Sequence, residues 1–223
     1  MDFIPNLTML PTPQRTLWRE LEATPDAFAL YGGTALSLRL GHRVSVDFDF
    51  FSNAPFNPGE LALAVPYLRD VEQVQLAPNT LTCRIDRAGP VLVSFFGALG
   101  LGQVAAHEVV RGMALRVASL LDIAGTKVAV VQRRAEEKDY VDLDALLQHG
   151  IDLPTALAAG TVVYGRGFNP LITLKALSYF DDVPALPAAV KARLRAAVAA
   201  VDVLQLPVLT PYIRRPADRG APE

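Results

Sequence analysis

The 223-residue sequence has a single cysteine, Cys83, so no disulfide can form within the chain. A lone cysteine in a strand-like segment is best interpreted as a small buried hydrophobe. The three histidines, at positions 42, 107 and 149, lack metal-ligand spacing with each other or with Cys83. The shortage of both residue types argues against a disulfide scaffold and against a metal site built from Cys and His.

An excess of charge of one sign is also lacking. The chain has 21 Lys and Arg against 23 Asp and Glu, which gives a formal net charge of −2. This balance argues against a protein that coats nucleic acid with its whole surface, although a local basic patch is compatible with it.

Long apolar runs are absent. The opening residues, MDFIPNLTML, lack the basic region and the long apolar core of a signal peptide. The most apolar late stretch, 195–209, is interrupted by Asp202 and Gln205 and is too short to span a bilayer comfortably. We therefore expect a soluble, cytoplasmic protein with no membrane partner.

Caps and turn residues divide the first half of the chain into short strands and helices. Strands are predicted at 28–31, 45–51, 71–76, 80–85 and 91–96, with an extended piece near 115–117. Thr12, followed by Pro13, is predicted to cap a helix that continues through Leu21. Further helices are predicted at 34–40, closed by a glycine at position 41, and at 57–68.

The second half is predicted to be helical, at 119–134, 138–148, 169–180 and 187–203. The fold class that follows is α+β (α/β), a mixed sheet with flanking helices followed by a helical C-terminal part. We predict a sheet domain over 1–118 and a helical part over 119–213 that completes the active site. The tail, 214–223, is rich in Pro, Gly and charge and is expected to be frayed.

Two aspartates within one predicted strand form the main candidate site. Asp47 and Asp49 are two residues apart, so both side chains project from the same face of the strand, with Cα atoms roughly 6–7 Å apart. Val46, Phe48 and Phe50 are expected on the opposite, buried face. Neighbouring carboxylates repel each other unless a cation joins them, and oxygen ligands at this spacing suit Mg²⁺ or Mn²⁺ completed by substrate phosphates.

A possible phosphate site precedes the aspartates. Gly32, Gly33 and Thr34 lie between a predicted strand and a predicted helix, where backbone N–H groups can bind phosphate and the Thr34 hydroxyl can add a donor. A phosphate site beside a carboxylate pair is what metal-assisted nucleotidyl transfer requires.

A third cluster is expected in the helical half. Lys127 falls on the apolar stripe of the predicted helix 119–134, and Arg134 is expected to continue this face. Asp139 and Asp142 share a face of the next helix. Lys127 is interpreted as a phosphate contact because a buried lysine requires an anion. The alternatives are that Lys127 extends to the surface and that Asp139 merely favours a helix N-terminus.

These segments together resemble a known family. Gly32-Gly33-Thr34-Ala35-Leu36, followed by His42-Arg43-x-Ser45-x-Asp47-x-Asp49-Phe50-Phe51, is similar to the first motif of the AbiEii/AbiGii-type nucleotidyltransferase toxins. The segments 127–134 and 138–143 resemble the second and third motifs, and 169–182 resembles a late helix of the family. The resemblance implies a minimal nucleotidyltransferase fold of the DNA polymerase-β-like superfamily and transfer of a nucleotide from an NTP.

The resemblance also implies roles and partners. Asp47 and Asp49 would hold Mg²⁺, Gly33, Thr34 and Lys127 would contact the nucleotide phosphates, and Asp142 or else Asp139 would act as base or metal support. The acceptor would be RNA, with tRNA used by some members, and a cognate antitoxin would be a partner. Ser45 matches a position that some family antitoxins phosphorylate.

One position departs from the wider superfamily, which usually places a third carboxylate on a later central strand. The corresponding strand here, 90–96, has Ser94 where an acid is expected. Two alternatives therefore stay open beside the leading interpretation of an RNA-modifying toxin: a nucleotide-binding pseudoenzyme that acts through a protein partner, and a transferase acting on a small molecule or a protein. A basic groove in the helical half, using Arg116, Arg133, Arg134 and Arg166, would favour RNA.

Overall fold

The computed structural model describes residues 2–218, which fall into two compact units. The first unit extends to Gly100 and includes His107–Ala118, and the second consists of Leu101–Ala106 and the chain from Ser119 onward. The predicted boundary between residues 118 and 119 coincides with one of these divisions. The segment Leu101–Ala106, which we predicted to lie in the sheet domain, groups with the helical unit. Residues 219–223 of the predicted frayed tail lie outside the described residues, and a 3-10 helix forms at Pro216–Asp218.

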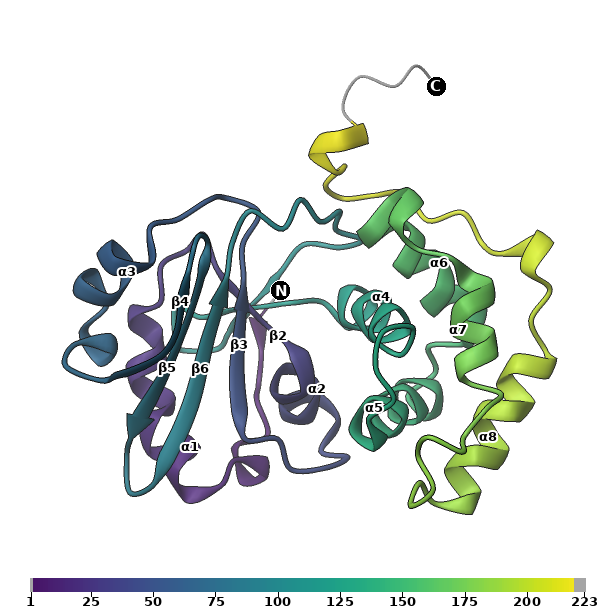
Figure 1. Cartoon of the computed structure of the whole chain (residues 1–223), viewed down its shortest axis with the longest axis horizontal. Coiled ribbons are helices and arrows are strands. Elements are labelled where there is room, and N and C mark those ends of the chain that lie inside the picture. Colours follow the sequence, from purple (N-terminus) through teal and green to yellow (C-terminus); the bar gives the residue numbers. More distant parts are fainter. Residues whose placement is uncertain (1, 219–223) are drawn as a thin grey trace. The chain divides into compact units, whose positions relative to one another are not determined.

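The first unit contains one mixed sheet, which confirms the predicted fold class. Its described strands follow the order β1-β7-β8-β2-β3-β6-β5-β4. Strand β3 is antiparallel to β2 and parallel to β6, and the strands labelled in this half of Figure 1 lie side by side. The bounds are β1 Asp2–Phe3, β2 Ala29–Tyr31, β3 Asp47–Phe51, β4 Glu72–Ala77, β5 Thr80–Asp86, β6 Pro90–Phe96, β7 Glu108–Val110 and β8 Arg116–Val117.

Three α-helices accompany the sheet: α1 (Thr12–Leu17), α2 (Gly32–Leu40) and α3 (Pro58–Ala64). The prediction for α1 was wrong in detail, since Pro11 is the N-cap and the chain continues from Trp18 as a 3-10 helix. Gly41 closes α2 in the left-handed conformation, as predicted. Helix α3 was predicted to reach residue 68 but ends at Ala64, because Val65 precedes a proline and adopts an extended conformation.

Aromatic side chains fill the core beneath β3. Phe48 and Phe50 are fully buried; the ring centroid of Phe50 lies 5.1 Å from that of Phe95 on β6, and that of Phe48 lies 6.3 Å from that of Trp18. Val46 does not join them. It lies before the strand begins and is 49% exposed, so the prediction that it shares the buried face was wrong.

The second unit is built from five α-helices of the described residues: α4 (Leu120–Val130), α5 (Glu137–Gln148), α6 (Leu153–Tyr164), α7 (Pro170–Ala176) and α8 (Ala188–Ala199). Helix α6 was not predicted, although Asp152 caps it by accepting from the Thr155 N–H and a proline stands in its first turn. The predicted helices at 119–134, 169–180 and 187–203 were several residues too long at their C-terminal ends. Within residues 2–218, no helix has the length and hydropathy required to cross a lipid bilayer.

Helices α4 and α6 pack with their backbones close together. A Cβ atom added to Gly125 on α4 would lie 2.9 Å from the carbonyl carbon and oxygen of Ala159 on α6. A backbone neighbour cannot rotate away, so a side chain at this position has to force the two helices apart.

We therefore predict that Gly125→Ala lowers the free energy of unfolding by about 1–3 kcal/mol, the usual range for overpacking a core. Gly167→Ala is the control, since nothing lies within 4 Å of the added Cβ atom there. Urea denaturation followed by circular dichroism measures both variants. Equal unfolding midpoints for Gly125→Ala and the wild type would contradict the close packing.

Candidate active site

Strand β3 presents the two aspartates on one face. Asp47, Asp49 and Phe51 alternate with the buried Phe48 and Phe50, and all three are partly accessible. The alternation arises because side chains of successive strand residues point to opposite faces, and the two phenylalanines occupy the core. The structure thus places both carboxylates on the face of the sheet opposite the aromatic core.

A row of polar side chains crosses the sheet at Asp49. In the strand register, Asp49 pairs with Tyr31 on β2 and with Ser94 on β6, and Ser94 pairs with Thr82 on β5. The Thr82 hydroxyl donates to Ser94 Oγ at 3.1 Å. Ser94 therefore occupies the position directly beside Asp49 where the superfamily pattern predicts an acid. Residues 2–218 contain no group of three or more His, Cys, Asp or Glu side chains arranged to hold a metal ion.

A neutral histidine lies at one end of this row. His107 Nε2 is 3.2 Å from the Tyr31 hydroxyl. Burial, together with the nearby positive charge of Arg116, lowers the pKa of His107 to about 4. The imidazole is therefore uncharged near pH 7 and adds no positive charge to this face of the sheet.

The N-terminus of α2 directly adjoins the Asp49 carboxylate. Strand β2 ends at Tyr31, and α2 begins with Gly32, which has a φ of 72°. A Cβ atom added to Gly32 would lie 2.8 Å from Asp49 Oδ2. Glycine thus meets two requirements here: the left-handed backbone conformation and the space beside the carboxylate.

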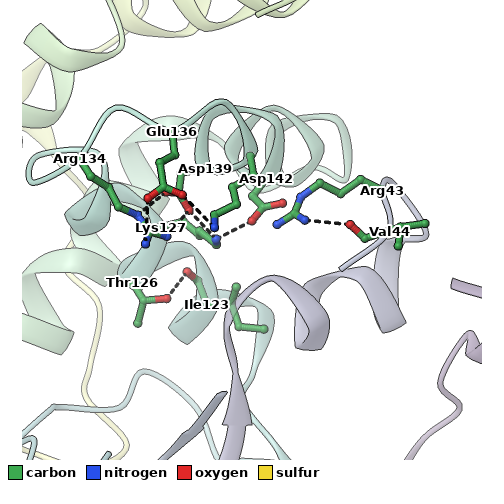
Figure 2. Close-up of polar contacts among 10 residues, drawn as sticks. Arg43, Val44, Ile123, Thr126, Lys127, Arg134, Glu136, Asp139 and Asp142 are labelled. Atoms are coloured by element: carbon green, nitrogen blue, oxygen red, sulfur yellow. Dashed lines mark hydrogen bonds and ion pairs between the residues drawn. The ribbon is translucent and has the colours of Figure 1, made fainter. Parts of the chain in front are cut away.

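Gly33 lies beside two polar side chains from the loop that enters β3. A Cβ atom there would be 2.4 Å from the Arg43 Nη2 atom and 3.0 Å from Ser45 Oγ. The Ser37 hydroxyl donates to the Arg43 carbonyl oxygen at 2.6 Å. Arg43 Nη1 donates to the Val44 carbonyl oxygen at 3.0 Å (Figure 2). Gly33 and Ser45, both predicted site residues, are therefore brought together. Arg43 was not predicted as a site residue, although it lies in the same sequence motif, two residues before Ser45.

Thr34 makes a different contact from the one predicted. Its hydroxyl donates to the backbone carbonyl oxygen of Asp47 at 2.5 Å, and the side chain is almost fully buried. A hydroxyl has one proton to donate, so in this conformation it cannot also donate to a phosphate. Thr34 fixes the start of β3 relative to α2.

In the second unit, Lys127 is the centre of a buried ion-pair cluster. Its side chain is 7% exposed, and Nζ lies 2.8 Å from Asp139 Oδ1 and 2.5 Å from Asp142 Oδ2, with both carboxylates fully buried (Figure 2). The alternative that Lys127 extends to the surface is therefore wrong. The anions that its burial requires are supplied by α5, so burial alone does not indicate a bound phosphate.

Arg134 joins the cluster from outside α4. The helix ends at Val130, so the prediction that Arg134 continues its face was wrong. Instead, Arg134 Nε donates to Asp139 Oδ2 at 2.8 Å. Burial acts to raise the pKa of Asp139, but hydrogen bonds and positive charge from Arg134 and Lys127 outweigh it, and the pKa is lowered. Asp139 is thus held as a carboxylate.

The sequence of this chain matches a known protein family. Residues 15–212 match the family model described as "Nucleotidyl transferase AbiEii toxin, Type IV TA system". This chain belongs to the AbiEii nucleotidyltransferase toxin family. Membership confirms the resemblance carried by the sequence motifs and makes the chain a nucleotidyltransferase of a type IV toxin–antitoxin family.

Individual proteins are similar to this AbiEii-family chain in sequence or in fold. An uncharacterised protein of Aquifex aeolicus (strain VF5) is 32% identical over 158 residues, which cover 70% of this chain and 74% of that protein. MenT4, a nucleotidyltransferase toxin from Mycobacterium tuberculosis H37Rv, has a similar fold with a TM-score of 0.58 and 23% identity, covering 84% of this chain and 82% of that chain. An antigenic nucleotidyltransferase-like protein from Paracoccidioides brasiliensis has a TM-score of 0.51 and 17% identity, covering 85% of this chain and 94% of that chain.

The contact between Gly32 and Asp49 yields a matched test. We predict that Gly32→Ala reduces nucleotidyl transfer, because it adds a methyl group against Asp49 Oδ2. The variant should also lower the thermal midpoint of unfolding, since an alanine in the left-handed conformation costs about 1–2 kcal/mol. Gly112→Ala is the control, since Gly112 has a φ of 74° but nothing within 4 Å of the added Cβ atom. Equal loss of activity in the two alanine variants would show that only backbone strain is being measured.

The ion-pair cluster yields a stability test. We predict that Lys127→Met lowers the free energy of unfolding by about 3–5 kcal/mol, because it leaves the two carboxylates Asp139 and Asp142 buried without their ammonium partner. Lys175→Met, at an exposed position on α7, is expected to stay close to the wild type. Chemical denaturation at pH 7 compares the three proteins, and a loss below about 1 kcal/mol for Lys127→Met would rule out a structural role for the cluster.

Proposed function

We propose that this chain transfers a nucleotide from an NTP to RNA, with tRNA as the favoured acceptor class, in a reaction that depends on Mg²⁺ or Mn²⁺ held by Asp47 and Asp49. The observation that supports this most strongly is the contact between the N-terminus of α2 and the carboxylate face of β3, at Gly32 and Asp49. A phosphate-binding helix end beside two carboxylates brings together the two elements that nucleotidyl transfer requires.

The phosphate part of the proposed site uses the first turn of α2. The backbone N–H groups of Gly32 and Gly33 have no earlier partner within the helix and lie at its positive end. The Arg43 guanidinium and the Ser45 hydroxyl lie beside Gly33 and would add a positive charge and a donor. A phosphate group attached to Ser45 would place negative charge here, so we expect it to weaken NTP binding.

The residues present fit a divalent cation. Two partly accessible carboxylates project from one strand face, and Gly32 leaves open the space beside Asp49 that any side chain would fill. Carboxylate oxygens suit Mg²⁺ and Mn²⁺, and with only two protein carboxylates the remaining ligands would come from phosphate oxygens and water. When bound, the ion would neutralise phosphate charge and favour attack at the α-phosphate.

The remaining proposed roles rest on the family motifs of the helical unit. By those motifs, Lys127 is proposed to contact a nucleotide phosphate. Asp142, or else Asp139, is the proposed base that accepts the proton of the attacking hydroxyl. The lowered pKa of Asp139 makes it a weaker base than an ordinary aspartate.

The RNA acceptor and the antitoxin partner rest on family membership together with surface charge. Arg133 and Arg166 are exposed on the helical unit and could contact an RNA backbone. Arg116 lies on β8 in the sheet unit, so it does not belong to the helical half as expected, and Arg134 is engaged with Asp139. A type IV toxin family implies an antitoxin that counteracts the protein.

A second candidate function is that of a nucleotide-binding pseudoenzyme acting through a protein partner. The specific observation in its favour is Ser94, which stands in register beside Asp49 in place of an acid. In this case the site binds NTP, and a serine at the position of the expected third carboxylate makes transfer slow.

The test is to incubate the chain with Mg²⁺, each α-labelled NTP and total tRNA, beside Asp47→Asn and the exposed control Asp26→Asn. We predict that label appears in RNA with the wild type and with Asp26→Asn. Asp47→Asn is expected to reduce labelling at least on the order of 100-fold. Mutation of a residue that only supports a metal ligand already lowers metal affinity or activity about 10–100-fold.

The other outcomes separate the candidates. Label on a protein or on a small molecule would replace RNA with a different acceptor class. NTP binding without transfer to any acceptor would favour the pseudoenzyme. Equal labelling by Asp47→Asn and Asp26→Asn would contradict the assignment of the aspartate pair.

A further inference from the structure

A buried glutamine on α1 contacts the backbone next to Asp47. Gln14 is 3% exposed, and its Nε2 atom donates to the carbonyl oxygen of Val46 at 2.6 Å. The two residues are 32 positions apart in the sequence, and Gln14 precedes the segment 15–212 that matches the family model. Neither the motifs nor the family match therefore assigns it a role.

At its first residue, β3 is paired with only one of its two neighbouring strands: Asp47 pairs with Leu92 of β6. Strand β2 pairs with β3 only from Tyr31, opposite Asp49, to Ala29, opposite Phe51. Asp47 and Val46 lie beyond the last paired residue of β2. The carbonyl group of Asp47 therefore has no donor from β2, and a buried carbonyl without a partner is costly.

Two helices donate to carbonyl groups at the start of β3. Gln14 on α1 binds the Val46 carbonyl, and Thr34 on α2 binds the Asp47 carbonyl. The two carbonyl groups belong to the peptides on either side of the Asp47 Cα atom. Fixing both peptides restricts the φ and ψ angles of Asp47, and hence the direction in which its carboxylate projects.

The orientation of the Gln14 amide is determined by this contact. Among the described residues, Gln14 Oε1 is buried and has no hydrogen-bond partner. Reversing the amide would place this oxygen against the Val46 carbonyl oxygen, where neither atom can donate. An unsatisfied buried acceptor is unfavourable for folding, so the amide is better explained by what its Nε2 atom holds in place than by a net gain in stability.

We propose that Gln14 is a positioning residue for Asp47. Gln14 holds the Val46–Asp47 peptide, so that the Asp47 carboxylate is already oriented before a divalent cation binds. This inference rests on the proposed role of Asp47 as a metal ligand. Gln14 would touch neither substrate nor metal and would act only through the backbone.

The test measures Mn²⁺ binding directly, by electron paramagnetic resonance of the full chain without NTP, so that it does not depend on transfer activity. Four proteins are compared: the wild type, Gln14→Met, Asp47→Asn, and Gln73→Met as a control at an exposed glutamine on β4. We expect Gln14→Met to raise the Mn²⁺ dissociation constant about three- to tenfold, the equivalent of one lost hydrogen bond. Its thermal midpoint should change little, because methionine also removes the unsatisfied Oε1 atom.

Each result decides the inference. A Mn²⁺ dissociation constant for Gln14→Met within twofold of the wild type and of Gln73→Met would overturn it while leaving the metal site intact. Mn²⁺ binding that is insensitive to Asp47→Asn would overturn both the metal site and the inference. If Gln14→Met does not fold, Gln14→Leu also removes the amide donor without adding a group that can donate, and unchanged Mn²⁺ binding by this variant would overturn the inference in the same way.

Discussion

The aromatic core beneath β3 constrains the whole candidate site. Phe48 and Phe50 are fully buried, and Phe50 stacks on Phe95 of the neighbouring strand. Since successive strand residues face opposite sides, burying these two rings forces Asp47 and Asp49 onto the other face. A one-residue slip of register would bury both carboxylates and expose the aromatic rings, so the same packing that stabilises the sheet also fixes which face carries the charge.

The carboxylates of the sheet unit and those of the helical unit differ in exposure and in pairing. On β3, the carboxylates of Asp47 and Asp49 are partly accessible and lie beside a glycine that leaves room for a ligand. In the helical unit, Asp139 and Asp142 are fully buried and paired with Lys127. The first arrangement suits binding of a cation and phosphate. The second holds charged groups in fixed positions, which is favourable only because each charge is paired.

Features with a local cause could be predicted from the sequence. The alternation of Asp47 and Asp49 with phenylalanines predicted the face of the strand, and Gly41 predicted the end of α2. Features that depend on distant residues were missed. Gln14 appeared to be one more residue of a short helix, because its contact with Val46 joins segments 32 positions apart. The burial of Lys127 was predicted, but its partners are determined by how α4 packs on α5. Helix α6, which is rich in small and apolar residues, lacks the alternation of polar and apolar positions that indicates a surface helix.

The most direct measurement is X-ray diffraction from crystals soaked with Mn²⁺ and a non-hydrolysable NTP, using the anomalous signal of manganese. The account predicts an anomalous peak between the carboxylates of Asp47 and Asp49, with phosphate density at the N-terminus of α2 beside Gly32 and Gly33. Well-ordered nucleotide and manganese bound elsewhere, with no peak at the two aspartates, would contradict the central claim that β3 and α2 together form the nucleotide site.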